Sequence, residues 1–210
     1  MKIQYLGHAS FLITTNAGTR IVTDPFDPAL YPDTLTYKAF NEPADIVTIS
    51  HDHKDHSAAH VVKNSPLIIR GGGKFVACEV EFLGVETYHD DSRGSKRGKN
   101  TAFVISVDGL KIVHLGDLGH ILTADQAAEI GAVDITLIPV GGFYTIDACQ
   151  AAKVAAQLDG IEWTRAHQLA GVFPTVVEFA NTNEQELKRI PGIGDKLSAS
   201  IIRQLQGSGI

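Results

Sequence analysis

Short apolar runs of β type, separated by turn residues, fill most of the first three quarters of the chain. Asn16-Ala17-Gly18 gives a tight connection between two early runs, and Asp108-Gly109, the strongest short hairpin signal, separates two later ones. The chain is therefore predicted to open with a β-meander, and a second group of paired strands follows. The predicted strands cover residues 3–6, 10–14, 19–23, 45–49, 101–107, 110–115 and 133–139.

Helical periodicity lies between these groups and dominates after Gly160. Residues 123–130 are predicted to form a helix with Thr123 as its N-cap, and residues 147–158 carry alanine, valine and leucine on one helical face. Beyond Gly160 the pattern predicts only short helices, at 164–170, 174–180, 184–190 and 195–205. We therefore predict an α+β domain over residues 1–159 and a small all-α domain over residues 160–210.

Composition and charge narrow the class of protein. With 210 residues, 44% of them hydrophobic and 20% charged, the chain is expected to be globular. No segment has the length of a membrane span, so we expect no membrane partner and, by default, a cytoplasmic location. The formal net charge of −6 falls entirely on residues 1–159, because residues 160–210 (the tail) contain equal numbers of acidic and basic residues. This charge argues against bulk electrostatic binding of nucleic acid but permits a local contact.

Four histidines and two aspartates lie in the eleven-residue segment SHDHKDHSAAH, directly after an apolar run. Within it, His51, His53, Asp55 and His56 form the pattern H-x-H-x-D-H. On a loop that leaves a strand, His51 and His53 can bind one metal while Asp55 and His56 reach a second. Imidazole and carboxylate ligands suit Zn²⁺, and also Mn²⁺ or Fe²⁺. His60 lies outside this spacing and is expected to be an exposed helical residue.

Two further candidate ligands follow other β-runs. His89 could complete a three-histidine site with His51 and His53, and Asp117, which has glycines on either side, could bridge two cations. Alone, the histidine would be an ordinary surface residue and the aspartate a turn residue. Their positions at strand ends, in a chain that carries the first motif, make both candidate metal ligands.

A set of motifs in this order resembles the metallo-β-lactamase superfamily, and more narrowly the small zinc-dependent hydrolases related to ascorbate-phosphate lactonase. The likeness covers about residues 1–158. The motifs are Tyr5-Leu6-Gly7-His8-Ala9-Ser10, Thr23-Asp24-Pro25-Phe26, Ser50-His51-Asp52-His53-Lys54-Asp55-His56, His114-Leu115-Gly116-Asp117 and Ile138-Pro139-Val140-Gly141-Gly142.

The resemblance implies an αββα sandwich with metals at one edge of the two sheets. It assigns His51, His53 and His89 to the first metal, Asp55 and His56 to the second, and Asp117 to the bridge between them. In this branch a histidine near the pocket occupies the position of His8, for which a turn or core role is the alternative.

One element of the resemblance is missing. In the family, the helix that matches residues 147–158 is followed by a strand and a final histidine, which completes the second metal site. Residues 160–169 take that place here, and His167 lies in a helical pattern without the strand. We interpret His167 as a structural or surface residue, with a replacement ligand as the alternative. Whether one or two metals bind, and whether water or another chain completes the second site, stays open.

The tail resembles a helix-hairpin-helix domain. Its motif is Pro191-Gly192-Ile193-Gly194 within residues 187–202, and residues 164–183 read as a degenerate first copy. Such a turn points free N–H groups at a phosphate, so residues 187–203 are a candidate DNA contact in which Lys196 and Arg203 would meet phosphates. The alternative is a helical turn that packs on the main domain or on another subunit, as in a homo-oligomer.

Three other patterns carry weaker expectations. Cys78 and Cys149 belong to no CxxC pair and are expected to be small buried hydrophobes. Gly71-Gly72-Gly73-Lys74 lacks the spacing of a phosphate-binding loop and is expected to be a flexible turn. The basic segment 93–100, close to His89, is either a solvated loop or a guide for an anionic substrate.

Together these features predict a metal-dependent hydrolase. A metal-activated hydroxide would attack a small anionic ester, phosphoester or lactone, on its own or in contact with nucleic acid. Asp55 and Asp117 are the candidate catalytic residues, because either could orient the water. The alternative is a catalytically impaired metal-binding scaffold whose helical tail contacts DNA or protein.

Overall fold

The computed structural model describes residues 1–33, 35–38, 41–158, 183–189, 194, 195 and 198. Contacts within the chain define two compact units, Met1–Asp159 and Gly160–Ile210. In the second unit, helix α5 (Glu184–Leu187) begins after Asn183, whose side chain accepts hydrogen bonds from two backbone N–H groups. The predicted helices 164–170 and 174–180, and most of 195–205, lie outside the described residues.

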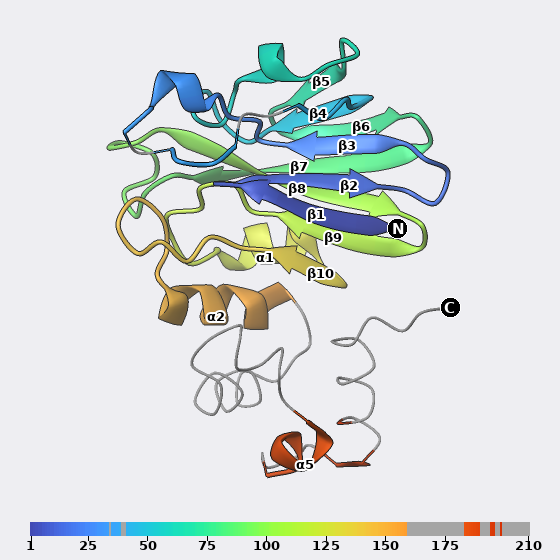
Figure 1. Cartoon of the computed structure of the whole chain (residues 1–210). Coiled ribbons are helices and arrows are strands. Elements are labelled where there is room, and N and C mark those ends of the chain that lie inside the picture. Colours follow the sequence, from blue (N-terminus) through green and yellow to red (C-terminus); the bar gives the residue numbers. More distant parts are fainter. Residues whose placement is uncertain (34, 39–40, 159–182, 190–193, 196–197, 199–210) are drawn as a thin grey trace. The chain divides into compact units, whose positions relative to one another are not determined.

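Two five-stranded sheets form the body of the first unit (Figure 1), which confirms the predicted sandwich. In the first sheet the order is β1-β2-β3-β4-β5, with β1–β3 antiparallel and β3–β5 parallel. In the second the order is β10-β9-β8-β7-β6, and only β10 joins in parallel. The strands are β1 Lys2–Gly7, β2 Ser10–Thr14, β3 Arg20–Thr23, β4 Ile46–Ile49, β5 Leu67–Arg70, β6 Gly73–Ala77, β7 Val80–Tyr88, β8 Lys99–Val107, β9 Leu110–His114 and β10 Ile135–Leu137.

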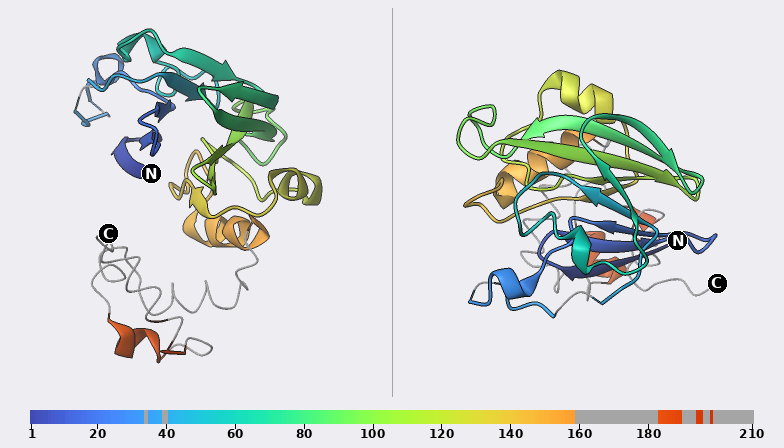
Figure 2. Two further views of the ribbon diagram at one scale, coloured as in Figure 1. Left: turned by 90° about the vertical axis from the view of Figure 1, so that its right-hand side faces the viewer. Right: turned by 90° about the horizontal axis from the view of Figure 1, so that it is seen from above.

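Strand β8 shows how the layers are held together, because its side chains alternate between two buried faces. Phe103 and Ile105 point between the sheets and pack in one cluster with Ile13, Ile21 and other residues of the first sheet. Ala102 and Val104 point the other way, into a cluster with the apolar faces of α1 (Ala124–Ile130) and α2 (Ala148–Leu158). The helices therefore cover the outer face of the second sheet, as the right-hand view of Figure 2 shows.

The outer face of the first sheet is covered differently. Leu12, Val22 and Val47 pack there against Ala44 and Val62. These last two residues belong to the connections on either side of β4. The described parts of the two connections contain the short 3₁₀ helices η1 (Pro28–Leu30) and η2 (Ala59–Val61), an isolated bridge between Pro43 and Lys63, and otherwise turns and loops. His60 lies on η2 with its side chain exposed.

Strands β5 and β6 are absent from the sequence prediction because they are edge strands whose side chains are mostly exposed, so no apolar alternation marks them. Of the expected flexible turn at residues 71–74, only Gly71 and Gly72 form the bend between these strands, while Gly73 and Lys74 belong to β6. Gly84 of β7 lies against this bend so closely that a Cβ atom there would be 2.2 Å from the Gly71 carbonyl oxygen.

The prediction that both cysteines are buried is wrong. Cys78 and Cys149 are free and exposed. Cys78 lies in the tight turn between β6 and β7, where its φ of 49° is positive. Cys149 lies in the first turn of α2, whose buried face is formed instead by Ala151, Val154 and Leu158.

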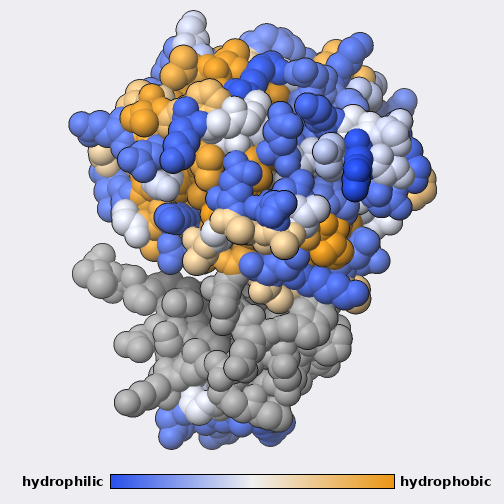
Figure 3. Space-filling model, turned by 180° about the vertical axis from the view of Figure 1, so that it is seen from behind, coloured by the Kyte–Doolittle hydropathy of each residue, from blue (hydrophilic) through white to orange (hydrophobic). Residues whose placement is uncertain are grey.

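Viewed from behind, the surface of the first unit mixes hydrophilic residues with scattered apolar ones (Figure 3). Among the described residues, no helix is long and apolar enough to cross a membrane.

The predicted N-cap at Thr123 is confirmed as a full capping box and supports a stability test. The Thr123 hydroxyl accepts from the Gln126 N–H at 3.2 Å, and the Gln126 side chain accepts from the Thr123 N–H at 3.0 Å. Thr123→Ala should lower the free energy of unfolding by about 1 kcal/mol, measured by urea denaturation, because one N–H of the first turn loses its acceptor. Thr123→Ser keeps an acceptor and is the control; equal losses in the two variants would contradict the assignment.

Candidate metal centre

The candidate ligands meet because several strands run in the same direction. Pairing makes β1 and β4 of the first sheet parallel to each other, and likewise β7 and β9 of the second. Loops that leave the carboxyl ends of such strands emerge at one edge of a sheet. The H-x-H-x-D-H motif follows β4, His89 follows β7, Asp117 follows β9, and His8 lies in the turn after β1.

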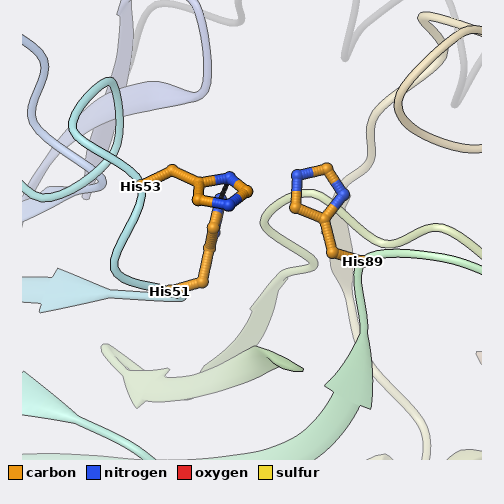
Figure 4. Close-up of side chains that lie close together, drawn as sticks. All are labelled: His51, His53 and His89. Atoms are coloured by element: carbon orange, nitrogen blue, oxygen red, sulfur yellow. Dashed lines mark hydrogen bonds between the residues drawn. The ribbon is translucent and has the colours of Figure 1, made fainter. Parts of the chain in front are cut away.

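Three histidines form the first group of ligand atoms. His51, His53 and His89 each offer one ring nitrogen, and these nitrogens lie within 4.8 Å of one another. Nε2 of His51 is 3.1 Å from Nδ1 of His53. The two rings on the loop after β4 face the ring of His89, which comes from the opposite sheet (Figure 4).

A second group lies beside the first and contains His8, Asp55 and His56, whose ligand atoms also fit within 4.8 Å. Nε2 of His8 is 3.0 Å from Nε2 of His56 and 3.3 Å from Oδ2 of Asp55. Nε2 of His56 is 3.8 Å from the same Asp55 oxygen.

Asp117 lies between the two groups. Its Oδ2 atom is 3.2 Å from Nε2 of His56 and 3.2 Å from Nε2 of His89. The Asp117 N–H donates to the buried side chain of Asn100 at 3.1 Å, which fixes the loop. The preceding Gly116 has a φ of +53°, and a Cβ atom there would be 2.5 Å from both Ser50 and Asn100. Glycine thus lets the loop approach its neighbours closely enough to present Asp117 to both groups.

A fully buried carboxylate, that of Asp24, supports the histidines from behind. It accepts from Nδ1 of His56 at 3.0 Å and from the Ser50 N–H at 2.8 Å, and the Ser50 hydroxyl also donates to it. That hydroxyl lies 2.9 Å from Nδ1 of His51 and can accept its hydrogen. Both rings therefore turn Nε2 toward the site, the arrangement in which outer groups orient metal-ligating histidines.

Electrostatics favour a cation here. Burial would raise the pKa of Asp117, but hydrogen bonds with His56 and His89 outweigh it and keep the carboxylate ionised. Burial lowers the pKa of His51 to about 3, so this ring stays neutral, as a metal ligand must. Burial would also lower the pKa of His56, yet hydrogen bonds with Asp117 and Asp24 raise it to about 10. The site thus attracts positive charge at His56, where a proton and a metal would compete.

Imidazole nitrogens and carboxylate oxygens, with their rings oriented from behind, fit a zinc-type cation or another divalent transition metal. The structure brings all six predicted ligands into one cluster, together with His8. The six are His51, His53, Asp55, His56, His89 and Asp117. Asp52, between two of them in sequence, points away and pairs with Arg70. His60 lies outside the cluster and pairs with Asp27 at 3.5 Å. His167 lies outside the described residues.

Comparison with known proteins adds an independent observation. Residues 2–160 match a family model described as "Beta-lactamase superfamily domain". The chain belongs to the metallo-β-lactamase superfamily. Residues 152–206 match a second model, described as a "SAM-like Helix-hairpin-helix tandem", which confirms the predicted likeness of the tail.

Three known proteins similar to this chain match between 73% and 97% of it. A "UPF0173 metal-dependent hydrolase" from Thermococcus onnurineus is 28% identical and covers 97% of this chain and 96% of its own. Another from Carboxydothermus hydrogenoformans is 32% identical over 73% of this chain and 78% of its own. A crystal structure from Thermotoga maritima, assigned as a zinc-dependent hydrolase of the superfamily, is 43% identical with a TM-score of 0.61, and covers 74% of this chain and 70% of its own.

A cavity of about 680 Å³ opens directly on this metallo-β-lactamase centre. Its lining combines the cations Lys96 and Arg97 with several apolar residues. The lining residues include His8, His53, Asp55, His89, Asp117, Phe11, Leu137, Ile138, Pro139, Val140, Phe143 and Tyr144. The Arg97 guanidinium lies 5.1 Å from the centre of the Tyr144 ring.

Buried Asp90, next to His89, holds the basic loop in place. Its carboxylate accepts four backbone N–H groups of the loop at 2.7 to 3.0 Å, from Ser92, Gly94, Lys96 and Arg97. Burial opposes ionisation, but these bonds lower the pKa of Asp90 to about 2. The loop is therefore anchored, and sequence patterning missed the anchor because Asp90 looks like one more polar loop residue.

Asp24 provides a test of the support behind the ligands. Asp24→Asn should weaken the affinity for Zn²⁺ roughly 10- to 100-fold, because the rings of His51 and His56 lose the group that orients them. Competition with a chromogenic chelator measures this. Asp52→Asn, an exposed acid in the same motif, should leave the affinity unchanged. Unchanged affinity in a folded Asp24→Asn variant would contradict the assigned role.

Proposed function

We propose that the protein is a zinc-dependent hydrolase of a small anionic ester, phosphoester or lactone. The observation that carries this proposal is the cavity, whose lining holds metal-ligand candidates together with Lys96 and Arg97. The relatives named metal-dependent hydrolases support it, as does the nitrogen and oxygen donor set, which suits Zn²⁺ and also Mn²⁺ or Fe²⁺.

When bound, such cations lower the pKa of water and polarise the oxygen of a scissile ester. The chain's own residues would position the reactants. Asp55 and Asp117 both line the cavity and are both ionised at neutral pH, since hydrogen bonds with histidines outweigh burial and lower their pKa values, that of Asp55 to about 2. Each can accept a hydrogen bond from the attacking water and so orient it toward the substrate.

The cavity walls set the substrate class. A volume of about 680 Å³ suits a small molecule. Asp90 accepts the backbone N–H groups of Lys96 and Arg97, so the loop that carries these cations is fixed. The Lys96 ammonium already pairs with Asp91 at 2.9 Å, so the Arg97 guanidinium, beside the Tyr144 ring, is the better partner for an anionic group. Phe11, Ile138 and other apolar lining residues would contact a ring or short hydrocarbon part of the same substrate. A compact amphiphilic anion fits this lining.

Hydrolysis is tested with the metal-loaded chain on a panel containing a phosphodiester, a phosphomonoester, a lactone and a carboxylic ester. We expect turnover of at least one anionic member and its loss in Asp117→Ala, because that variant removes the carboxylate shared by both ligand groups. Metal analysis of the purified protein identifies the ion. No turnover across the panel by a metal-loaded chain would reject the hydrolase and favour a binding scaffold.

The anionic preference is tested at Arg97. Arg97→Ala should lower kcat/KM for an anionic substrate about 10- to 100-fold, because the transition state loses a hydrogen bond to a charged group. The kcat/KM for a neutral analogue should fall much less. The matched control is Lys99→Ala, because Lys99 is a cation of the same segment that pairs with Glu86 at 3.4 Å and does not line this cavity. Equal losses for charged and neutral substrates would contradict anion recognition.

We also propose that residues 187–203 contact DNA, supported by the match to a helix-hairpin-helix tandem. Lys188 pairs with Asp195 at 2.7 Å and Glu184 at 3.6 Å. Lys196 and Arg203 are the candidate phosphate contacts that the sequence offers. The whole chain should bind duplex DNA with an affinity that falls as salt rises, and Lys196→Ala/Arg203→Ala should weaken it, measured by fluorescence anisotropy. Lys74→Ala/Lys153→Ala removes two exposed cations of the first unit and is the charge-matched control. Salt-independent or absent binding by the whole chain would reject the contact.

A further inference from the structure

The geometry points to His8 as a ligand of a second cation, beside the three-histidine group. This inference rests on the proposed metal dependence but not on the substrate.

Ligand atoms of three residues, His8, Asp55 and His56, lie within 4.8 Å of one another at this position. Nε2 of His8 lies 3.0 Å from Nε2 of His56 and 3.3 Å from Oδ2 of Asp55. Oδ2 of Asp117 lies beside this group, 3.2 Å from Nε2 of His56. The three residues would supply three of the four ligands that a zinc site needs, with Asp117 or water as the fourth.

The hydrogen bond between His56 and Asp24 fixes which ring nitrogen faces the second site. His56 gives its Nδ1 hydrogen to Asp24, a carboxylate that can only accept, so its Nε2 faces His8. Two facing ring nitrogens can share one proton, or each can donate a lone pair to a cation placed between them and the carboxylates.

His8 lies in the tight turn after β1, with a φ of +54°, directly after Gly7, whose φ is +123°. Histidine is one of the residue types that adopt this left-handed region more often than most, so the turn accommodates it. The turn brings the imidazole to the edge of the sheet where His56 and Asp55 lie.

Side chains around the turn hold this conformation. The Tyr5 hydroxyl donates to the His8 carbonyl at 3.0 Å, and Nε2 of His114 donates to the Ala9 carbonyl at 2.9 Å. A Cβ atom on Gly7 would come within 2.6 Å of the Tyr37 ring, which packs against the turn. The imidazole of His8 is thus placed in advance, as a ligand from a rigid turn should be.

The test counts metal ions rather than turnover. The whole chain, stripped with a chelator, is titrated with Zn²⁺ by calorimetry and with Co²⁺ by visible absorption. The wild type should bind two equivalents. His8→Asn should lose the second equivalent or bind it at least 10-fold more weakly, with the first unchanged.

The asparagine variant tolerates positive φ, so it removes the imidazole without disturbing the turn. His8→Gln, a second variant, should behave in the same way, and far-UV circular dichroism confirms that both fold. His60→Ala removes an exposed histidine outside the cluster and should bind like the wild type.

Three results would overturn the inference: a wild type that binds only one equivalent, folded His8 variants that still bind two with wild-type affinity, or loss of the second equivalent in His167→Ala but not in the His8 variants. If two equivalents depend on His8 but no substrate is hydrolysed, the hydrolase proposal fails while the ligand assignment stands.

Discussion

One buried carboxylate, that of Asp24, is the constraint on which the candidate centre depends. It follows β3 and accepts hydrogen bonds from His56 and from both the backbone and hydroxyl of Ser50, at the end of the neighbouring strand β4. Through Ser50 it also reaches His51. A charge buried so completely is tolerated because every bond it accepts is strong, and those bonds turn two rings toward the cavity.

The two sheets contribute to the centre in different ways. The first sheet supplies H-x-H-x-D-H, Asp24 and the turn with His8, whereas the second supplies His89, Asp117 and the basic loop. Packing of Phe103 and Ile105 against the first sheet therefore also fixes the distance between the two sets of ligands. The apolar core between the sheets is for this reason part of the metal site's rigidity.

Sequence patterning could predict the strands that alternate or pair through a clear turn, such as β2, β8 and β9, and the helix capped by Thr123. It could not predict β5 and β6, whose exposed edges give no periodic signal. The H-x-H-x-D-H spacing points to ligands because neighbours in sequence share a loop. The supporting roles of Asp24 and Asp90 depend on contacts with distant or backbone groups, which spacing does not record.

The loop held by Asp90 begins at a metal-ligand candidate, and its two ends are tied, since the His89 N–H donates to the Gly98 carbonyl at 3.1 Å. The ligand candidate His89 and the cations Lys96 and Arg97 thus lie toward opposite ends of one short, closed segment. The bonds to Asp90 come from backbone N–H groups, so they do not depend on which side chains the loop carries. Under the proposed function, the side chains of this loop can therefore be exchanged to suit another anion while its backbone, and His89 with it, stays in place.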